Sequence, residues 1–488
     1  MTTETSSSTR GLTLSDICSR LQAAGQEHVL QYVEDLTEGD RQALLQQLDS
    51  IQVDQIESLY QTALAHDTAA TTGDDDIKAI QPFSGPVGKS SDDNSSTWRA
   101  TGMAAIATGQ VAALVLAGGQ GTRLGYDGPK GMYNIGLPSQ RTLFQLIAER
   151  LLKLRKLAST GGERTECSLP FYIMTSPLNH QVTVDYFAEH NYFGLGSDTV
   201  FFFQQGMLPC LTEDGKMILE SKCQVAMAPD GNGGIYPSLQ SSGALRDMED
   251  RGVQYIHVFS IDNALTKPAD PVFVGYCISQ QADCGNKVVW KAHAHEKVGV
   301  MASKANQPCI VEYSEITTEM AERVEASSGS LVFGAANICN HFYTMDFLQN
   351  TILPNMSNLY HVARKKIPYY DPVRNQTTTP ESTNNGVKLE TFIFDVFPLS
   401  QRMALFEVDR DDEFAPVKNS AGSPTDSPDT ARTMISHQAK RWVISAGGKL
   451  SGKDDDENIC EIAPRTSYAG EGLESLVQDK DIPCPFFL

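Results

Sequence analysis

A glycine-rich stretch with two cations is the part of the sequence best suited to chemistry. Residues 116–132 read LAGGQGTRLGYDGPKGM and follow directly after an apolar run. The glycines at its start let a backbone turn sharply and approach a ligand closely. Consecutive N–H groups in such a turn can bind phosphate oxygens, and Arg123 and Lys130 place two positive charges beside them. The stretch therefore predicts a loop that binds a polyphosphate.

The order of glycines and cations distinguishes three kinds of phosphate loop. A Walker A loop requires Gly-Lys followed by Ser or Thr, which is absent here. A dinucleotide loop requires G-x-G-x-x-G, but Leu124 stands at the third glycine position, and the acidic residue expected ~20 positions later is missing. From Gly119 to Lys130 the order is G-x-G-T-R-L followed by P-K, which is typical of sugar nucleotidyltransferases. An ordinary tight turn does not account for the two cations.

The elements around this loop predict an α/β fold. Val111–Leu116 is a continuous apolar run, as expected of a strand buried on both faces of a parallel sheet. Further apolar strands are expected at Phe171–Met174, Val200–Phe203 and Tyr255–Ile261, with helices between several of them. We expect a central Rossmann-like, doubly wound mixed sheet, with a small N-terminal helical domain and a small C-terminal α+β domain. Ligands of such sheets bind beyond the carboxyl ends of the strands.

Changes in pattern along the chain predict three regions. Leu12 to Leu64 has helical periodicity, and residues 67–97 have the Thr, Gly and Ser clusters of a linker. The predicted boundaries are residues 1–100 for an N-terminal helical arm and linker, 101–390 for the nucleotidyltransferase domain and 391–488 for a C-terminal domain.

Charge and composition exclude several classes of partner. The 488 residues contain 39 Lys and Arg against 60 Asp and Glu, a net charge of -21. Such a surface repels nucleic acids and anionic membranes. We find no secretory signal, no membrane-spanning run and no CxxC pair among the ten cysteines, so a cytoplasmic protein with reduced thiols is expected. His293 and His295 fit an exposed strand face better than a metal site.

Two polar residues follow predicted strands. Asp262 ends the strand YIHVFSI, and a carboxylate beside a phosphate loop is a good Mg2+ ligand. Gln205 offers both a donor and an acceptor, as the edge of uracil requires. Each could instead be an ordinary strand-end residue, a turn former or a cap.

Several further segments carry a resemblance to one family. They are FFQQGMLP (202–209), MAPDGNGG (227–234), SIDN (260–263), VEYSE (311–315), AANICNHF (335–342), NGVKLETFIFD (385–395) and DEFAPVKN (412–419). With the glycine-rich loop they resemble the eukaryotic UDP-N-acetylglucosamine pyrophosphorylases of the UDPGP type 1 family, with a fungal source favoured. The resemblance covers roughly residues 98 to 450.

The resemblance implies an activity and a set of residues. It implies Mg2+-dependent, in-line conversion of UTP and N-acetyl-α-D-glucosamine 1-phosphate to UDP-N-acetylglucosamine and pyrophosphate, for chitin, N-glycan and GPI-anchor synthesis. It assigns catalytic roles to Arg123, Lys130 and Lys418, and metal binding to Asp262. Nucleotide contacts are implied for Leu116, Ala117, Gly118, Gly119, Lys130, Gln205, Gly231, Asp262 and Lys388, and sugar contacts for Asn232, Gly299, Glu312, Asn337 and Lys418.

The reaction needs cations rather than a general base. A phosphate monoester has its second pKa near ~6, so the attacking oxygen is already ionised at neutral pH. Alternatives are the same chemistry on N-acetylgalactosamine 1-phosphate or glucose 1-phosphate, and a glycosyltransferase that uses a nucleotide sugar. The latter typically has an acidic pair and often a membrane anchor, but Asn263 follows Asp262 here. Only small-molecule partners are expected, with a monomer slightly favoured.

Overall fold

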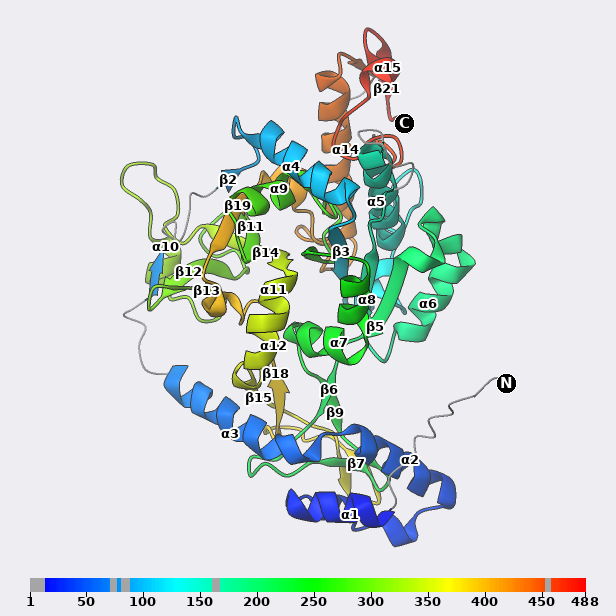
Figure 1. The fold of residues 1–488 in the computed structure, drawn as a ribbon, viewed down its shortest axis with the longest axis vertical. Helices are drawn as coiled ribbons and strands as arrows, with labels where there is room; N and C mark the ends of the chain where they lie inside the picture. The colour runs from blue at the N-terminus through cyan, green and yellow to red at the C-terminus, as the bar shows by residue number, and fades with distance from the viewer. Residues whose placement is uncertain (1–13, 71–76, 80–87, 160–166, 453–457) are drawn as a thin grey trace, which may run out of the picture. The chain divides into compact units, whose positions relative to one another are not determined.

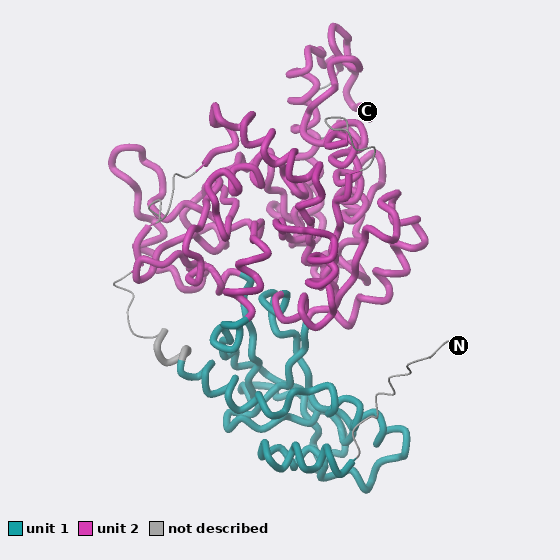
Figure 2. Tube along the Cα trace, viewed as in Figure 1, with its two compact units in different colours: residues 1–74, 206–235, 354–393 teal, residues 75–205, 236–353, 394–488 magenta. Residues whose placement is uncertain are grey.

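The chain forms two compact units. The computed structural model describes residues 14–70, 77–79, 88–159, 167–452 and 458–488 (Figure 1). Unit 1 comprises residues 1–74, 206–235 and 354–393, and unit 2 comprises residues 75–205, 236–353 and 394–488 (Figure 2).

An 11-stranded mixed sheet is the centre of unit 2. Its main path runs β2-β19-β11-β14-β10-β3-β4-β5. The neighbours β10, β3, β4 and β5 are parallel, whereas β14 is antiparallel to both β10 and β11. The strand bounds are β1 Ile77–Ala79, β2 Gly88–Lys89, β3 Val111–Leu116, β4 Phe171–Thr175, β5 Val200–Gln204, β10 Tyr255–Ser260, β11 Cys284–Trp290, β12 Val300–Lys304, β13 Gln307–Val311, β14 Ala335–Thr344 and β19 Met403–Glu407. The predicted α/β sheet is confirmed.

The register of the parallel strands places their carboxyl ends at one edge. Leu116 at the end of β3 pairs with Ser260 of β10 and with Met174 of β4. Thr175 at the end of β4 pairs with Gln204 of β5. The loops that follow β3, β4, β5 and β10 therefore start side by side.

Helices of unit 2 alternate with these strands. α5 follows the glycine-rich loop and buries the apolar side chains on one face, including Phe144, Leu151 and Leu154. Thr142 Oγ1 accepts from Gln145 N at 3.4 Å, but the Gln145 side chain donates to Glu149 instead of completing a capping box. The longer helices are α4 Ser95–Ala107, α5 Leu143–Ser159, α6 His180–Glu189, α7 Ile235–Ser241, α8 Ala244–Asp250, α9 Pro271–Ser279 and α14 Pro428–Ser445.

The C-terminal region is not separate from this sheet. β19 pairs in parallel with β11, so residues beyond 394 contribute a strand to the large sheet. The chain then forms α13 Arg410–Glu413, α14, β20 Lys449–Gly452, α15 Glu474–Val477 and β21 Asp481–Cys484, with a small apolar cluster that includes Val443 and Val477. The predicted boundary at 390/391 lies close to a unit boundary, but the C-terminal region belongs to unit 2 because of this long-range pairing.

Unit 1 combines the N-terminal helices with two later segments. α1 Leu14–Ala23, α2 Glu38–Ser50 and α3 Val53–Ala70 share a core with residues 206–235 and 354–393, in which Leu44 and Tyr60 pack with Leu211 and Val387. The later segments form β6 Met207–Pro209 with β9 Met227–Pro229, β7 Leu219–Ser221 with β8 Gln224–Val225, β15 His361–Lys365 with β18 Gly386–Glu390, and β16 Tyr369–Asp371 with β17 Gln376–Thr378. The predicted region 1–100 is thus divided, because α4 belongs to unit 2.

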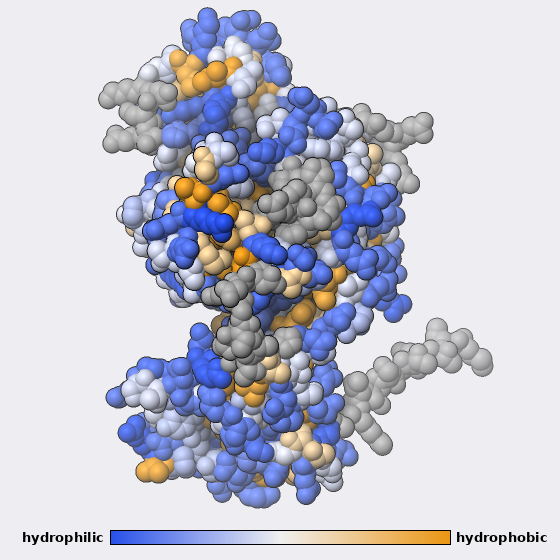
Figure 3. Space-filling model, turned by 90° about the vertical axis from the view of Figure 1, so that its left-hand side faces the viewer, coloured by the Kyte–Doolittle hydropathy of each residue, from blue (hydrophilic) through white to orange (hydrophobic). Residues whose placement is uncertain are grey.

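One face of the molecule can be judged for its polarity. The face in Figure 3 is largely hydrophilic, with hydrophobic side chains in small groups. No helix in the part of the chain that the structure describes is both long and apolar enough to cross a membrane. All ten cysteines are free thiols.

Candidate active site

The glycine-rich loop folds back on itself. Lys130 N donates to Gly119 O at 3.1 Å, and Gly121 N donates to Gly128 O at 2.8 Å. These bonds make a narrow loop that returns the chain to the end of β3. The spacing between the glycines and Lys130 therefore places this lysine beside the backbone of Gly119.

Both cations of the loop lack partners in the part of the chain that the structure describes. Arg123 is exposed on the 3-10 helix η4 (Thr122–Leu124), and Lys130 is half-buried at the start of η5 (Lys130–Met132). Among the described residues neither side chain makes an ion pair or a hydrogen bond. Two uncompensated charges are therefore available to an anion at this loop.

A buried amide that sequence reasoning missed holds the loop in place. Asn179 is 1% exposed. Its Nδ2 donates to Ala117 O at 3.0 Å and to Gly119 O at 3.4 Å, and its Oδ1 accepts from Ser176 N at 2.8 Å. The available signal was its place just after β4, where polar side chains meet the loop after β3.

Gln205 lies against the glycines of the loop. Its N–H donates to Thr175 O at 2.8 Å, which extends the β4–β5 pairing by one step. A Cβ on Gly118 would lie 2.5 Å from Gln205 Oε1, so a side chain at position 118 would displace the Gln205 amide from this place. The nearby Ser176 Oγ is buried and has no hydrogen-bond partner among the described residues. An amide and an unpaired hydroxyl at this edge match the polar edge of a base.

Asp262 follows β10 at the same edge of the sheet. It is half-buried, and within the described ranges its carboxylate has no hydrogen bond or ion pair. Its carbonyl accepts from Val417 N at 2.9 Å, which brings the chain at Lys418 alongside. Burial raises the pKa of the Cys339 thiol to about 12, with the Asp262 carboxylate contributing and Lys418 opposing, so both charges lie near this thiol.

Three of the predicted sugar contacts lie together in unit 2. Asn337 N donates to Gly299 O at 2.9 Å, and Asn337 Oδ1 accepts from Cys339 N at 3.1 Å, which leaves its Nδ2 for a ligand. The Glu312 carboxylate packs against Gly299. Burial raises the pKa of Glu312, and Lys418 opposes this shift.

Lys418 is the third cation of unit 2 that the sequence predicts. Its Nζ lies 3.9 Å from Asp426 Oδ2 and 5.8 Å from the centre of the Phe414 ring. The side chain is 40% exposed, so the pair with Asp426 is weak and leaves Lys418 open to a phosphate.

The remaining predicted residues belong to unit 1. Gly231 has a φ of 85°, and a Cβ there would lie 2.2 Å from Thr391 O, so no other residue fits this turn. Asn232 Oδ1 accepts from Ile393 N at 3.0 Å. Lys388 is half-buried on β18, and among the described residues it makes no ion pair.

A buried carboxyl precedes Gly231. Asp230 is 3% exposed, its Oδ1 has no partner among the described residues, and burial raises its pKa to about 6. The folded pKa lies above the ordinary aspartate value of 3.8, so the stability contributed by the neutral carboxyl is fully present below about pH 3.8 and is lost as pH rises through 6.

We therefore expect Asp230→Asn to be the more stable protein at neutral pH. Its advantage in free energy of unfolding over the wild type should grow by about 2 kcal/mol between pH 4 and pH 7, because only the wild type ionises a buried group. Equilibrium urea unfolding at the two pH values measures this, with exposed Asp250→Asn as control. An advantage independent of pH would contradict the expectation.

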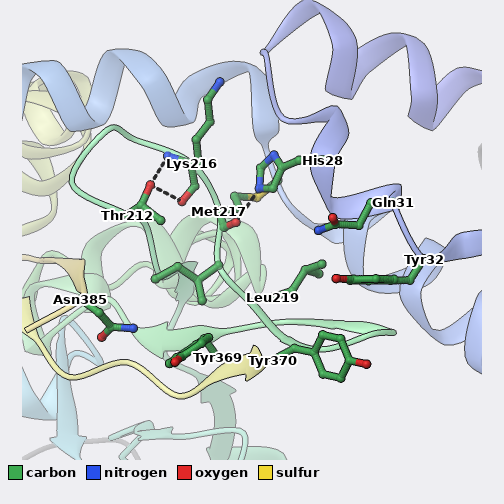
Figure 4. A pocket seen from close by; sticks show the side chains of 11 residues that line it. His28, Gln31, Tyr32, Thr212, Lys216, Met217, Leu219, Tyr369, Tyr370 and Asn385 are labelled. Atoms are coloured by element: carbon green, nitrogen blue, oxygen red, sulfur yellow. Dashed lines mark hydrogen bonds between the residues drawn. The ribbon is translucent and has the colours of Figure 1, made fainter. Parts of the chain in front are cut away.

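The cavity in Figure 4 is distinct from these residues. It has a volume of about 260 Å³ and is lined within unit 1 by side chains from 28–32, 212–219 and 369–385. Two hydrogen bonds join groups of the lining: His28 Nε2 bonds Met217 O at 2.7 Å, and Thr212 Oγ1 accepts from Lys216 N at 3.0 Å. None of the predicted site residues lines it.

Comparison with known proteins gives the family. A model described as UTP–glucose-1-phosphate uridylyltransferase matches residues 53–457, which is most of the chain. The chain belongs to this uridylyltransferase family. The predicted membership and enzyme class are confirmed: the protein is a nucleotidyltransferase of the sugar-1-phosphate uridylyltransferase type.

Relatives of this uridylyltransferase match over nearly its full length. UDP-N-acetylhexosamine pyrophosphorylase-like protein 1 of Xenopus tropicalis is 43% identical, over 96% of this chain and 95% of that protein. The UDP-N-acetylglucosamine pyrophosphorylase of Saccharomyces cerevisiae is 39% identical, over 92% and 94%. The crystal structure of the Trypanosoma brucei uridine diphosphate N-acetylglucosamine pyrophosphorylase in complex with inhibitor has a TM-score of 0.81 and 30% identity, over 95% of each chain.

Proposed function

We propose that this uridylyltransferase converts UTP and N-acetyl-α-D-glucosamine 1-phosphate to UDP-N-acetylglucosamine and pyrophosphate. The main support is the loop after β3, whose two cations have no partner among the described residues and lie beside its turned backbone. The choice of sugar is supported by the names of the full-length relatives and by Glu312 and Asn337, whose oxygen and nitrogen atoms suit hydroxyl and acetamido groups.

The proposed reaction joins two negatively charged phosphates, so its catalysis depends on positive charges. A phosphate oxygen of the sugar 1-phosphate bonds to the α-phosphorus of UTP, the bond from that phosphorus to the oxygen of the β-phosphate breaks, and pyrophosphate leaves with the electron pair. Since both reactants are anions, Arg123 and Lys130 act by holding and neutralising UTP phosphates, and Lys418 by holding the sugar phosphate. The forked guanidinium of Arg123 suits the departing pyrophosphate.

Mg2+ fits the donor set beside this loop. Asp262, just after β10, offers a carboxylate that has no partner among the residues that the structure describes. No group of three or more His, Cys, Asp and Glu side chains among the described residues could hold a metal alone, so UTP phosphates and water would supply the other ligands. Bound there, Mg2+ supplies neutralisation of phosphate charge.

We expect Asp262→Asn to raise the Mg2+ concentration for half-maximal turnover by about 10–100-fold, because an amide is a weaker ligand than a carboxylate. Pyrophosphate release at fixed UTP, titrated with Mg2+, measures this. Asp250→Asn, an exposed substitution on α8, is the control. An unchanged Mg2+ requirement in Asp262→Asn would contradict the proposed role of Asp262 as a metal ligand.

The roles in unit 1 and the cellular setting rest on the resemblance. On that basis we infer nucleotide contacts for Gly231 and Lys388, a sugar contact for Asn232, a cytoplasmic monomer, and a product used for chitin, N-glycan and GPI-anchor synthesis.

A substrate panel tests the proposal. The purified chain is incubated with UTP, Mg2+ and the 1-phosphates of N-acetylglucosamine, N-acetylgalactosamine or glucose, and pyrophosphate is followed. We expect the highest kcat/KM for N-acetylglucosamine 1-phosphate. Equal or faster turnover of glucose 1-phosphate would contradict the proposed sugar, and no pyrophosphate from any sugar would contradict the reaction.

A further inference from the structure

A segment that carries Lys418 lies against the chain that carries Asp262. Val417 N donates to Asp262 O at 2.9 Å, and Ala264 N donates to Ala415 O at 3.0 Å. Asn263 and Pro416 form an antiparallel bridge between these two bonds. The two stretches are far apart in the chain, since 152 positions separate Asn263 from Ala415.

The side chain of Asn263 completes this junction. It is 2% exposed. Its Nδ2 donates to Glu413 O at 2.7 Å, and its Oδ1 accepts from Ala415 N at 2.9 Å and from Leu265 N at 3.2 Å. The site requires a donor and an acceptor on one short side chain, which Asn provides and Asp, when ionised, does not.

The partner of Asn263 is itself firmly held. Glu413 ends α13, and its carboxylate lies 2.5 Å from Lys287 Nζ and 3.1 Å from Lys267 Nζ. Lys287 is fully buried and also pairs with Asp270 at 2.5 Å. The carbonyl that Asn263 contacts therefore belongs to a residue whose side chain is fixed by two buried ion pairs.

We propose that Asn263 is a positioning residue that fixes Lys418 relative to Asp262. Asp262 directly precedes Asn263, and Lys418 directly follows Val417, the last residue bonded at the junction. One buried amide thus sets the separation between the metal-binding carboxylate and the cation for the sugar phosphate. A misplacement of about 1 Å in such a pair can cost 10²-fold in rate. The kinetic consequence rests on the proposed function, whereas the anchoring does not.

Hydrogen exchange tests the anchoring without reference to activity. In Asn263→Asp and Asn263→Ala we expect the amides of Ala415 and Val417 to exchange at least about tenfold faster than in the wild type, because a bond of the junction is lost. Val477→Ala, in the C-terminal apolar cluster, is the control for a general loss of stability. Exchange of residues 413–418 that is unchanged in both Asn263 variants overturns the proposal.

Kinetics test the link to Lys418. Asn263→Asp should lower kcat/KM for the sugar 1-phosphate by about 10-fold or more, with KM for UTP changed less than about threefold. In a Lys418→Ala background the same substitution should have almost no further effect, since the two act as one unit. Equal effects of Asn263→Asp in both backgrounds overturn the positioning role. Wild-type turnover of Lys418→Ala refutes the proposed role of Lys418 itself, and the exchange data then decide the anchoring separately.

Discussion

Arg123→Ala and Lys130→Ala each lower kcat by about 10²-fold or more. Within the described residues both side chains are unpaired cations on the loop after β3. The reaction brings two anions together, so each substitution removes a preorganised charge at the reacting phosphates. Pyrophosphate release under saturating UTP and sugar 1-phosphate measures the loss. Lys130→Arg should recover more activity than Arg123→Lys, because a lysine cannot reproduce the fork on pyrophosphate.

Exposed cations elsewhere on unit 2 provide the controls. Lys156→Ala on α5 and Arg246→Ala on α8 remove the same charges from solvated positions, and we expect turnover within about twofold of the wild type. Near wild-type kcat in both Arg123→Ala and Lys130→Ala would place the triphosphate elsewhere and refute the proposed mechanism.

Lys287→Met lowers the free energy of unfolding by about 3–5 kcal/mol. Lys287 is fully buried between Asp270 and Glu413, and removing it leaves two buried carboxylates with only the half-buried Lys267 nearby. Burial raises the pKa of Asp270, but Lys287 and Lys267 outweigh it and hold the pKa at about 2. Without Lys287 that carboxylate becomes a buried, poorly compensated charge. Thermal and urea unfolding measure the loss.

A neutralised background separates charge from packing. Adding Asp270→Asn to Lys287→Met should restore part of the lost stability, since Glu413 keeps its ion pair with Lys267 at 3.1 Å and no buried carboxylate is then unpaired. The exposed Lys297→Met should shift the free energy of unfolding by less than about 0.5 kcal/mol. A loss for Lys287→Met as small as that of Lys297→Met would show that the network contributes nothing net to stability.

Local signals predicted the sheet and the phosphate loop. β3 and β4 are buried at every position and are mostly apolar, because both faces of the sheet are covered there, and such runs can be recognised in the sequence alone. The glycines, Arg123 and Lys130 lie within 12 positions of one another, so their joint geometry is set by the local backbone. Gln205 and Asp262 were predicted because each follows an apolar strand. The structure places both at the carboxyl edge of the sheet, next to the glycine-rich loop.

Two features could be found only from long-range packing: which segments form each unit, and which buried side chains hold the site residues in place. Segments 206–235 and 354–393 read like parts of a central domain, but their apolar side chains are buried with the N-terminal helices in one core. Asn179 and Asn263 look like turn formers in the sequence, and their roles arise from bonds to backbone 62 and 150 residues away.

The sequence by itself determined the family, the buried strands and the loop with its two cations, since each depends on neighbours along the chain. The tertiary structure decided which segments share a core, how Lys287 joins Asp270 to Glu413, and that one amide ties the end of β10 to the chain before Lys418. The physical reason is that ion pairing, strand pairing and burial depend on contacts between segments far apart in the chain. A single sequence shows which residues are apolar or charged, but not which distant segments come into contact.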